Sequence, residues 1–256
     1  MPPILIAGMH RSGTSWVARA LHDAGLHLGD DLVGAEPSNP YGHFEDEHVV
    51  ALHDDALAEH GLTWKSTEPP GPTSAAINRK MEALVEERES ANQPWGIKDP
   101  RLCLFLPDWL AACPNSFVLA VIRRPDEVVA SLHRRHAQRW VNTRHVDASD
   151  IAFWEEPDLG LRLWVHYYRR LLVALDEMPD QERRLCFDWN ATHSDASTLV
   201  EDLEASWNVG LQPTTTHRDE GLGNRAPSAI EVRDANLIEE AEDIWARLQG
   251  LCASTP

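Results

Sequence analysis

The stretch from Ile4 to Trp16 restricts the possible folds of this chain more than any other part of the sequence. The apolar run Ile4–Ala7 predicts a short buried strand, and Gly8 and Gly13 bracket a loop rich in polar side chains. A helix is expected to begin at about Thr14. In such a strand–loop–helix unit, the free N–H groups of the first helical turn face an anion. The sequence therefore predicts a phosphate-binding loop at the start of an α/β domain.

The identity of the bound phosphate compound is restricted by one position of this loop. The two glycines have the spacing of the nucleotide-binding motif G-x-x-x-x-G-K-[ST], but Thr14 stands where that motif has its lysine. The lysine normally contacts the phosphates of a Mg-nucleotide. We therefore expect a phosphorylated ligand other than an ordinary Mg-nucleotide, held by other basic side chains.

Helical and strand-like segments alternate along the rest of the chain. We expect strands at residues 4–7, 95–98, 117–122 and 185–187. We expect helices at 14–24, 46–60, 74–90, 102–112, from 126 onward, and at 159–178, 196–207 and 229–251. Irregular segments are expected at 25–41, 143–157 and 213–227. The unbroken apolar run Phe117–Ile122 is typical of a parallel strand covered on both faces. The pattern predicts a single three-layer, P-loop-like α/β domain over residues 1–256, with a central parallel sheet flanked by helices.

Three polar segments follow predicted strands. Gly8–Ser15, Asp99–Arg101 and Arg123–Arg124 lie far apart in the sequence, yet each comes directly after the carboxyl end of a strand. In parallel sheets, ligands bind beyond that edge, so we expect the three segments to converge on one site. Arginines at strand ends favour bidentate binding of phosphate without a metal ion.

The charge of the chain limits its partners. A net charge of −18 at pH 7 argues against a general nucleic-acid-binding protein, which needs a broad positive surface. An anionic ligand must then be held by local cations. Among the 23 lysines and arginines, the lysines are Lys65, Lys80 and Lys98.

The four cysteines lack the spacing of a metal site or of a disulfide framework. Cys103 and Cys186 lie in apolar segments and are expected to be buried free thiols. We expect neither a signal peptide nor a transmembrane segment, because the apolar runs have the length of strands. These features predict a protein of the reducing cytoplasm.

Four motifs in order resemble the PAPS-dependent sulfotransferases, which use 3′-phosphoadenylyl sulfate (PAPS). Arg11-Ser12-Gly13-Thr14-Ser15-Trp16 resembles their 5′-phosphosulfate loop, P-K-x-G-T-[TS]-W, and Arg123-Arg124-Pro125 followed by Ser131 resembles their 3′-phosphate motif, R-x-P…S. Asn39–Glu45 and Lys98–Arg101 are similar to strings in bacterial members that begin with G-M-H-R-S-G-T-S. The resemblance covers roughly the first half of the chain.

The resemblance implies PAPS as sulfonate donor, PAP as product and no metal ion. It implies a donor site formed by His10, Arg11, Ser12, Gly13, Thr14, Ser15, Trp16, Arg123 and Ser131, with Trp16 on the adenine and the last two residues at the 3′-phosphate. The family's C-terminal cofactor loop, R-K-G-x-x-G-x-x-K, has no clean match. Residues 218–225 lie in about the right place without the spacing.

A mechanism follows from these residues. Sulfuryl transfer is an in-line displacement in which negative charge grows on the leaving oxygen, and Arg11 can stabilise that charge. The acceptor must lose a proton to a base, for which Glu45 is the first candidate and His43 the second. Lys98, Asp99 and Arg101 are expected to position the sulfonate, the base or the acceptor. The predicted catalytic residues are thus Arg11, Glu45, His43, Lys98 and Asp99, with Glu45 and Arg101 predicted to bind the acceptor.

Other interpretations compete with these. Glu45 can instead cap a helix or interact with its dipole, and Asp99 can orient Arg101 or cap the next helix. The basic stretch 133–145 can contact the cofactor or an anionic acceptor, although its composition favours a solvated helix face. For the whole protein, the alternatives are a small-molecule kinase that uses ATP and Mg²⁺, or a nucleotide-binding regulator without catalysis. The acceptor, a small molecule, glycan or lipid, has no recognition signature in the sequence, and neither does an oligomeric state.

Overall fold

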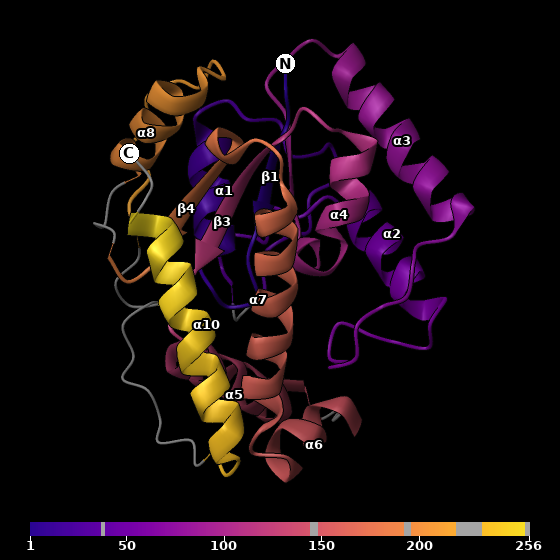
Figure 1. Ribbon diagram of the computed structural model, residues 1–256, viewed down its shortest axis with the longest axis vertical. Coiled ribbons are helices and arrows are strands. Elements are labelled where there is room, and N and C mark those ends of the chain that lie inside the picture. Colours follow the sequence, from indigo (N-terminus) through magenta and orange to yellow (C-terminus); the bar gives the residue numbers. More distant parts are fainter. Residues whose placement is uncertain (37–38, 144–147, 192–195, 219–231, 254–256) are drawn as a thin grey trace.

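A four-stranded parallel sheet forms the centre of the protein. The computed structural model describes residues 1–36, 39–143, 148–191, 196–218 and 232–253 (Figure 1). The strands lie in the order β2-β1-β3-β4, with β1 at Ile4–Ala7, β2 at Gly96–Lys98, β3 at Phe117–Ile122 and β4 at Arg184–Asp188. All three pairings are parallel. The predicted strands and the predicted parallel sheet are confirmed.

Helices cover both faces of the sheet. They are α1 (Thr14–Asp23), α2 (Glu47–Ala58), α3 (Ala75–Ser90), α4 (Leu102–Ala112), α5 (Pro125–Thr143), α6 (Ala148–Glu155), α7 (Leu159–Glu177), α8 (Ser197–Trp207) and α10 (Ala235–Ala253). Alternate strand residues enter two different cores, because successive side chains of a strand point to opposite faces. Leu5 and Val118 pack with α2–α5, α7 and α10, whereas Ile6 and Leu119 pack with α1 and α8. The three-layer architecture is therefore confirmed.

Two helices differ from the expectation. Residues 148–155 form α6 inside the segment expected to be irregular. A helix of 8 residues is marginal alone, and this one is held by burial of Phe153 in the core, which sequence periodicity does not show. The last helix begins at Ala235 instead of 229, and residues 229–231 lie outside the described ranges. Pro107 lies inside α4 without ending it.

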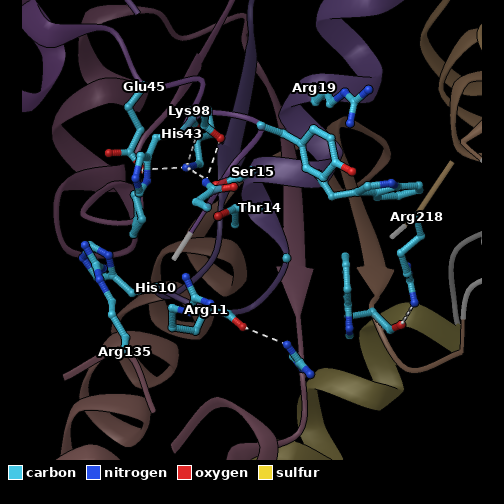
Figure 2. A pocket seen from close by; sticks show the side chains of 18 of the residues that line it. His10, Arg11, Thr14, Ser15, Arg19, His43, Glu45, Lys98, Arg135 and Arg218 are labelled. Atoms are coloured by element: carbon cyan, nitrogen blue, oxygen red, sulfur yellow. Dashed lines mark hydrogen bonds and ion pairs between the residues drawn. The ribbon is translucent and has the colours of Figure 1, made fainter. Parts of the chain in front are cut away.

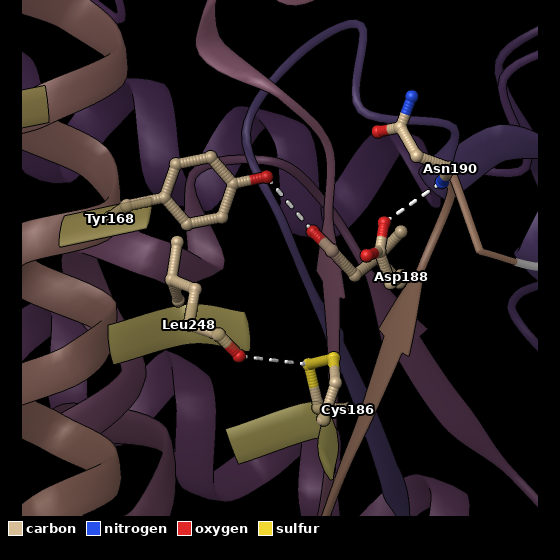
Figure 3. The surroundings of a disulfide bond; sticks show 7 residues. Tyr168, Cys186, Asp188, Asn190 and Leu248 are labelled. Atoms are coloured by element: carbon tan, nitrogen blue, oxygen red, sulfur yellow. Dashed lines mark hydrogen bonds between the residues drawn. A yellow bond between two sulfur atoms is a disulfide. The ribbon is translucent and has the colours of Figure 1, made fainter. Parts of the chain in front are cut away.

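Cys186 of β4 and Cys252 of α10 form a disulfide bond (Figure 3). The prediction of a free Cys186 thiol and of no disulfide is therefore wrong, because 66 positions separate the two cysteines and only the packing of α10 on β4 brings them together. Cys103 and Cys113 are buried free thiols, and burial raises the pKa of Cys113 to about 11. The expectation of a reducing compartment loses the support it drew from the cysteine spacing.

Loss of the disulfide should lower stability measurably. By the chain-entropy account, a cross-link over 66 positions restricts the unfolded chain, so Cys252→Ser should reduce the free energy of unfolding by about 2–4 kcal/mol. Urea denaturation of both proteins measures this difference. Reductant should destabilise the wild type by the same amount and leave the variant unchanged. A wild type that is indifferent to reductant contradicts the prediction.

Candidate active site

A cavity lies beyond the carboxyl ends of β1, β2 and β3 (Figure 2). The predicted site residues that line it are His10, Arg11, Gly13, Thr14, Ser15, Trp16, His43, Glu45, Lys98 and Arg123. They come from the Gly8–Ser15 and Arg123–Arg124 segments, from the end of β2 and from the segment before α2, and Pro100 of the Asp99–Arg101 segment also lines the cavity. The expected convergence at one edge of the sheet is therefore observed. Ser12, Asp99, Arg101 and Ser131 are not among the lining residues.

The loop after β1 has a backbone that requires glycine. Gly13 precedes α1 with a φ of +95°, and a Cβ atom there would lie 2.1 Å from the ring of Trp189. Gly13 also offers no side chain to cap the helix, so the positive end of α1 is left directed at the cavity. Ser12 is fully buried beneath the loop, where its Oγ lies 2.7 Å from the hydroxyl of Tyr168. Ser12 thus supports the loop from below.

Lys98 connects three parts of the site. Its buried ammonium donates hydrogen bonds to Glu45 Oε1 (2.5 Å), the His43 carbonyl (2.9 Å) and Ser15 Oγ (3.2 Å), as Figure 2 shows. Because an ammonium has three N–H groups, all of its donors are engaged. Lys98 therefore fixes the first candidate base, Glu45, next to the start of α1, where the predicted phosphate-binding loop ends.

The second candidate base stands beside the first. His43 Nδ1 lies 3.9 Å from Glu45 Oε1, and His43 Nε2 lies 3.6 Å from a carboxylate oxygen of Glu36. Burial, with Lys98 and Arg135 nearby, lowers the pKa of His43, although Glu45 and Glu36 oppose that shift. The imidazole is therefore neutral at pH 7, which is the form that accepts a proton.

A buried ion pair positions Glu45 from behind. Asp46, the next residue, caps α2 by accepting a hydrogen bond from the His48 N–H (2.9 Å) and pairs with Arg88 of α3. Both side chains of the pair are less than a tenth exposed. The capping residue of α2 is thus Asp46, and the alternative interpretation of Glu45 as the cap is wrong.

Asp99 and Arg101 form a structural network under the cavity. The carboxylate of Asp99 is fully buried, accepts a hydrogen bond from the Arg101 N–H (2.6 Å), and lies 3.3 Å from the Arg101 guanidinium and 3.4 Å from His53. Burial alone would raise its pKa, but Arg101 and His53 outweigh burial and hold the pKa well below its usual range. Since neither residue lines the cavity, both act on it indirectly, by fixing the segment of Lys98 and Pro100 and through their charges near His10.

Arginines concentrate on the other side of the loop. Arg11 Nε donates to Ser131 Oγ (2.9 Å), while Arg123 donates to the Arg11 carbonyl (3.2 Å) and to Glu127 (2.8 Å). Ser131 thus contacts Arg11, whereas the resemblance pairs it with Arg123. Burial lowers the pKa of Arg11 to about 10, and Arg135 and Arg123 add repulsion. An anion between these guanidinium groups would relieve that repulsion.

Sequence reasoning predicted Trp16 at the aromatic end of the cavity but missed Trp189 and the part that Arg218 plays there. The Arg218 guanidinium stacks 3.6 Å above the Trp189 ring and lies 5.2 Å from the Trp16 ring, and its Nη1 donates to the Trp189 carbonyl (3.0 Å). Within the part of the chain that the structure describes, its Nε and Nη2 are buried without a hydrogen-bond partner. Burial, with Arg123 nearby, lowers the pKa of Arg218 to about 10. These are donors placed for a ligand.

The signals for these residues were weak but present. Trp189 directly follows β4, at the sheet edge where ligands bind, and Arg218 begins the segment 218–225, of which residues 219–225 lie outside the described ranges. Arg135 belongs to the basic stretch expected to be a solvated helix face. That expectation is wrong for His136, which is 1% exposed, and for Arg135, whose side chain is 17% exposed and lines the cavity.

The fold and the cavity together define an α/β protein with a cationic cavity beside the glycine-bounded loop that follows its first strand. The sulfotransferase family model matches residues 2–213, and the chain belongs to this family. No curated protein sequence matches the chain. The resemblance found in the four motifs is thereby confirmed at the level of the family.

Solved structures support the same fold. The chain is similar to the sulfotransferase domain from the curacin biosynthetic pathway (16% identity, 97% of this chain and 98% of that chain covered, TM-score 0.57). It is also similar to the sulfotransferase domain of the Synechococcus PCC 7002 olefin synthase (16% identity, 96% of this chain and 94% of that chain covered, TM-score 0.55). A sulfotransferase from Alicyclobacillus acidocaldarius is similar as well (16% identity, 99% of this chain and 96% of that chain covered, TM-score 0.54).

None of the described helices is long and apolar enough to cross a membrane. Within the same residues, His, Cys, Asp and Glu do not form a group of three or more that could hold a metal ion.

Removal of Arg88 should destabilise the protein and disturb Glu45. Arg88→Met leaves the Asp46 carboxylate buried without its partner, which typically costs about 3–5 kcal/mol of stability. Lys80→Met is the matched control, since Lys80 pairs with Asp55 in solvent and such exposed pairs contribute about 1 kcal/mol or less. Chemical denaturation of both variants measures the difference. Equal losses would contradict a supporting role for the Arg88–Asp46 pair.

Proposed function

We propose that this sulfotransferase transfers the sulfonate of PAPS to a hydroxyl or amine of an acceptor and releases PAP, without a metal ion. The observation that carries the proposal is a cavity with two cationic ends and an aromatic surface between. Arg11 and Lys98 stand at the phosphate-binding loop, and Arg123 and Arg218 stand near Trp16 and Trp189. A nucleotide with phosphate groups at both its 5′ and 3′ positions matches this arrangement.

The unpartnered nitrogens support the fit of this donor. Arg218 Nε and Nη2 are buried donors without an acceptor among the described residues, although the net charge of the chain is −18. Buried donors left unpaired cost free energy, so a ligand that supplies anionic oxygens here is favoured. We assign the 3′-phosphate to Arg123 and Arg218, the adenine to Trp16 and Trp189, and the 5′-phosphosulfate to Arg11, Thr14 and Ser15.

The transfer step uses groups on both sides of the loop. A lone pair of the acceptor oxygen or nitrogen forms the new bond to sulfur as the bond between sulfur and the bridging oxygen breaks, and PAP leaves with that electron pair. Arg11 and the N–H groups at the start of α1 stabilise the charge that grows on the leaving oxygen. Arg11 carries a permanent charge and therefore acts as an electrostatic partner instead of a proton donor.

Glu45 accepts the proton of the acceptor. Lys98 holds its carboxylate at the cavity wall next to Ser15, on the side where an acceptor can enter. His43 is the alternative base and otherwise positions the acceptor. Asp99 and Arg101 act indirectly, by fixing the segment that follows Lys98.

Calorimetry with PAP, ATP and AMP tests the donor. We expect PAP to bind without metal and more tightly than AMP, because only PAP offers a 3′-phosphate to Arg123 and Arg218. ATP binding that requires Mg²⁺, with no response to PAP, would support a kinase instead. PAP binding without turnover of PAPS over a broad acceptor panel would support a regulator.

Arg218→Ala should weaken PAP binding by about 10-fold or more, since a charge-assisted hydrogen bond is worth about 1.5–3 kcal/mol. Arg124→Ala is the matched control, because Arg124 is exposed, pairs with Asp126 and does not line the cavity. Titration calorimetry with PAP measures both affinities. An unchanged affinity in Arg218→Ala excludes this residue from the 3′-phosphate site.

The two candidate bases can be separated by substitution and pH. Glu45→Gln should abolish turnover while PAP binding survives, because the variant keeps the shape of the side chain and loses the proton acceptor. If His43 is the base instead, the rate should fall as pH decreases through its lowered pKa, below 6.5, as His43 becomes protonated. Profiles of kcat/KM against pH for His43→Asn and the wild type decide between the two bases. If His43→Asn loses most of the rate and no longer shows the fall in rate at low pH, the base is His43.

A further inference from the structure

The cavity has a second cationic wall, beyond the residues assigned to the donor. Figure 2 shows Arg135 and His10 across the cavity from Arg218, on the same side as His43 and Glu45. The adenosine end of PAPS is assigned to Arg218 and Trp16, and the base is assigned to Glu45. If that proposed function is correct, on which this inference rests, the wall with Arg135 and His10 faces the acceptor.

The position of Arg135 follows from the helix that carries it. Ser131 and Arg135 lie one turn apart on α5 and therefore share a face of the helix. Ser131 contacts Arg11, so Arg135 lies one turn beyond that contact, and it also lines the cavity. Its side chain is 17% exposed and lies 3.7 Å from the carboxylate of Glu36, which is 49% exposed. Arg135 is thus a largely desolvated cation, and the carboxylate of its partner Glu36 lies at the solvent edge.

The charge on this wall is positive. Arg134 and Arg135 both act on the buried Arg11 and contribute to the lowered pKa of its guanidinium. Among the described residues that line the cavity, Glu45 is the one with a carboxylate, and Lys98 already binds that carboxylate. The excess of positive charge is local, since the chain as a whole has a net charge of −18. A bound anion would offset the repulsion among these arginines.

His10 adds a neutral hydrogen-bonding group. Its Nε2 atom is buried and has no hydrogen-bond partner among the residues described, and its ring packs 4.4 Å from that of Trp64. Burial, with Arg101 and Arg135 nearby, keeps the pKa of His10 well below its usual range, so the imidazole is neutral at pH 7. With its proton on Nε2, a neutral imidazole donates one hydrogen bond, which an anionic oxygen accepts. Imidazole and guanidinium together suit a carboxylate, phosphate or sulfate group.

We propose that the acceptor of this enzyme carries an anionic group near the hydroxyl or amine that receives the sulfonate, and that Arg135 and His10 bind this group. The site thus selects hydroxylated or aminated acids over their neutral analogues. Arg135 holds the anionic group on the same side of the cavity as Glu45, where the acceptor gives up its proton.

Matched acceptor pairs test this inference on PAP-saturated protein. Two pairs are acids with their amides, namely 4-hydroxyphenylacetate and 12-hydroxydodecanoate. In two further pairs, glucose 6-phosphate and glucose 6-sulfate are each compared with glucose. Titration calorimetry measures each affinity. We expect the acid of at least one pair to bind about 10-fold or more tightly than its neutral partner. The pair that shows the preference identifies the source of the anionic group.

Variants assign that preference to Arg135. Arg135→Met should abolish the preference for the acid, Arg135→Lys should retain part of it, and Glu36→Gln should increase it, because the competing carboxylate is removed. Arg162→Met is the control of equal charge change, since Arg162 pairs with Glu156 away from the cavity. This control should keep the full preference for the acid. PAP affinity should stay within about twofold of wild type in Arg135→Met.

Three results would overturn the inference. The first is that no acid binds more tightly than its neutral partner, and the second is that the preference survives in Arg135→Met. The third is a large loss of PAP affinity in Arg135→Met, which would assign Arg135 to the donor. Failure of the wild type to bind PAP contradicts the proposed function itself, and this result is seen before any acceptor is added.

Discussion

The buried ammonium of Lys98 is the contact on which the arrangement of the cavity depends. Lys98 ends β2, and its three hydrogen bonds reach the segment before α2 and the first turn of α1. These parts of the chain are distant in sequence, and the Lys98 ammonium contacts all of them. A buried cation is costly unless it is paired, so the position of Glu45 is set by the requirement to neutralise Lys98. One interaction thereby links the phosphate-binding loop to the candidate base.

The cations of the cavity impose a second constraint. Arg11, Arg123 and Arg135 lie close enough to repel one another, and the repulsion is partly offset by Glu127 and Glu36. The protein tolerates this concentration of charge because its remaining surface is strongly acidic, with a net charge of −18 for the whole chain. An anionic ligand is favoured in the cavity and disfavoured elsewhere on the surface. The contrast supports two anions in one site, the donor and, as we infer, the acceptor.

Prediction succeeded where local sequence and tertiary structure favour the same result. The run Phe117–Ile122 is apolar throughout, and it forms a buried central strand with the expected bounds. Prediction from the sequence failed for α6 and for the Cys186–Cys252 bond, because both depend on packing between segments that are not neighbours in sequence. Asp99 shows an intermediate case, because its proximity to Arg101 was visible in the sequence while its complete burial was not.

The sequence by itself determined the strand–loop–helix unit at the N-terminus, the order of the strands and of the helices other than α6, and the family to which the motifs belong. It could do so because glycine spacing, apolar runs and strand-end arginines are local features whose physical effect does not depend on distant partners. The tertiary structure decided that Lys98 binds Glu45, that Ser131 contacts Arg11, and that Trp189, Arg218 and Arg135 complete the cavity. Each of these contacts joins segments brought together only by the parallel sheet and its helices. No local pattern could specify them.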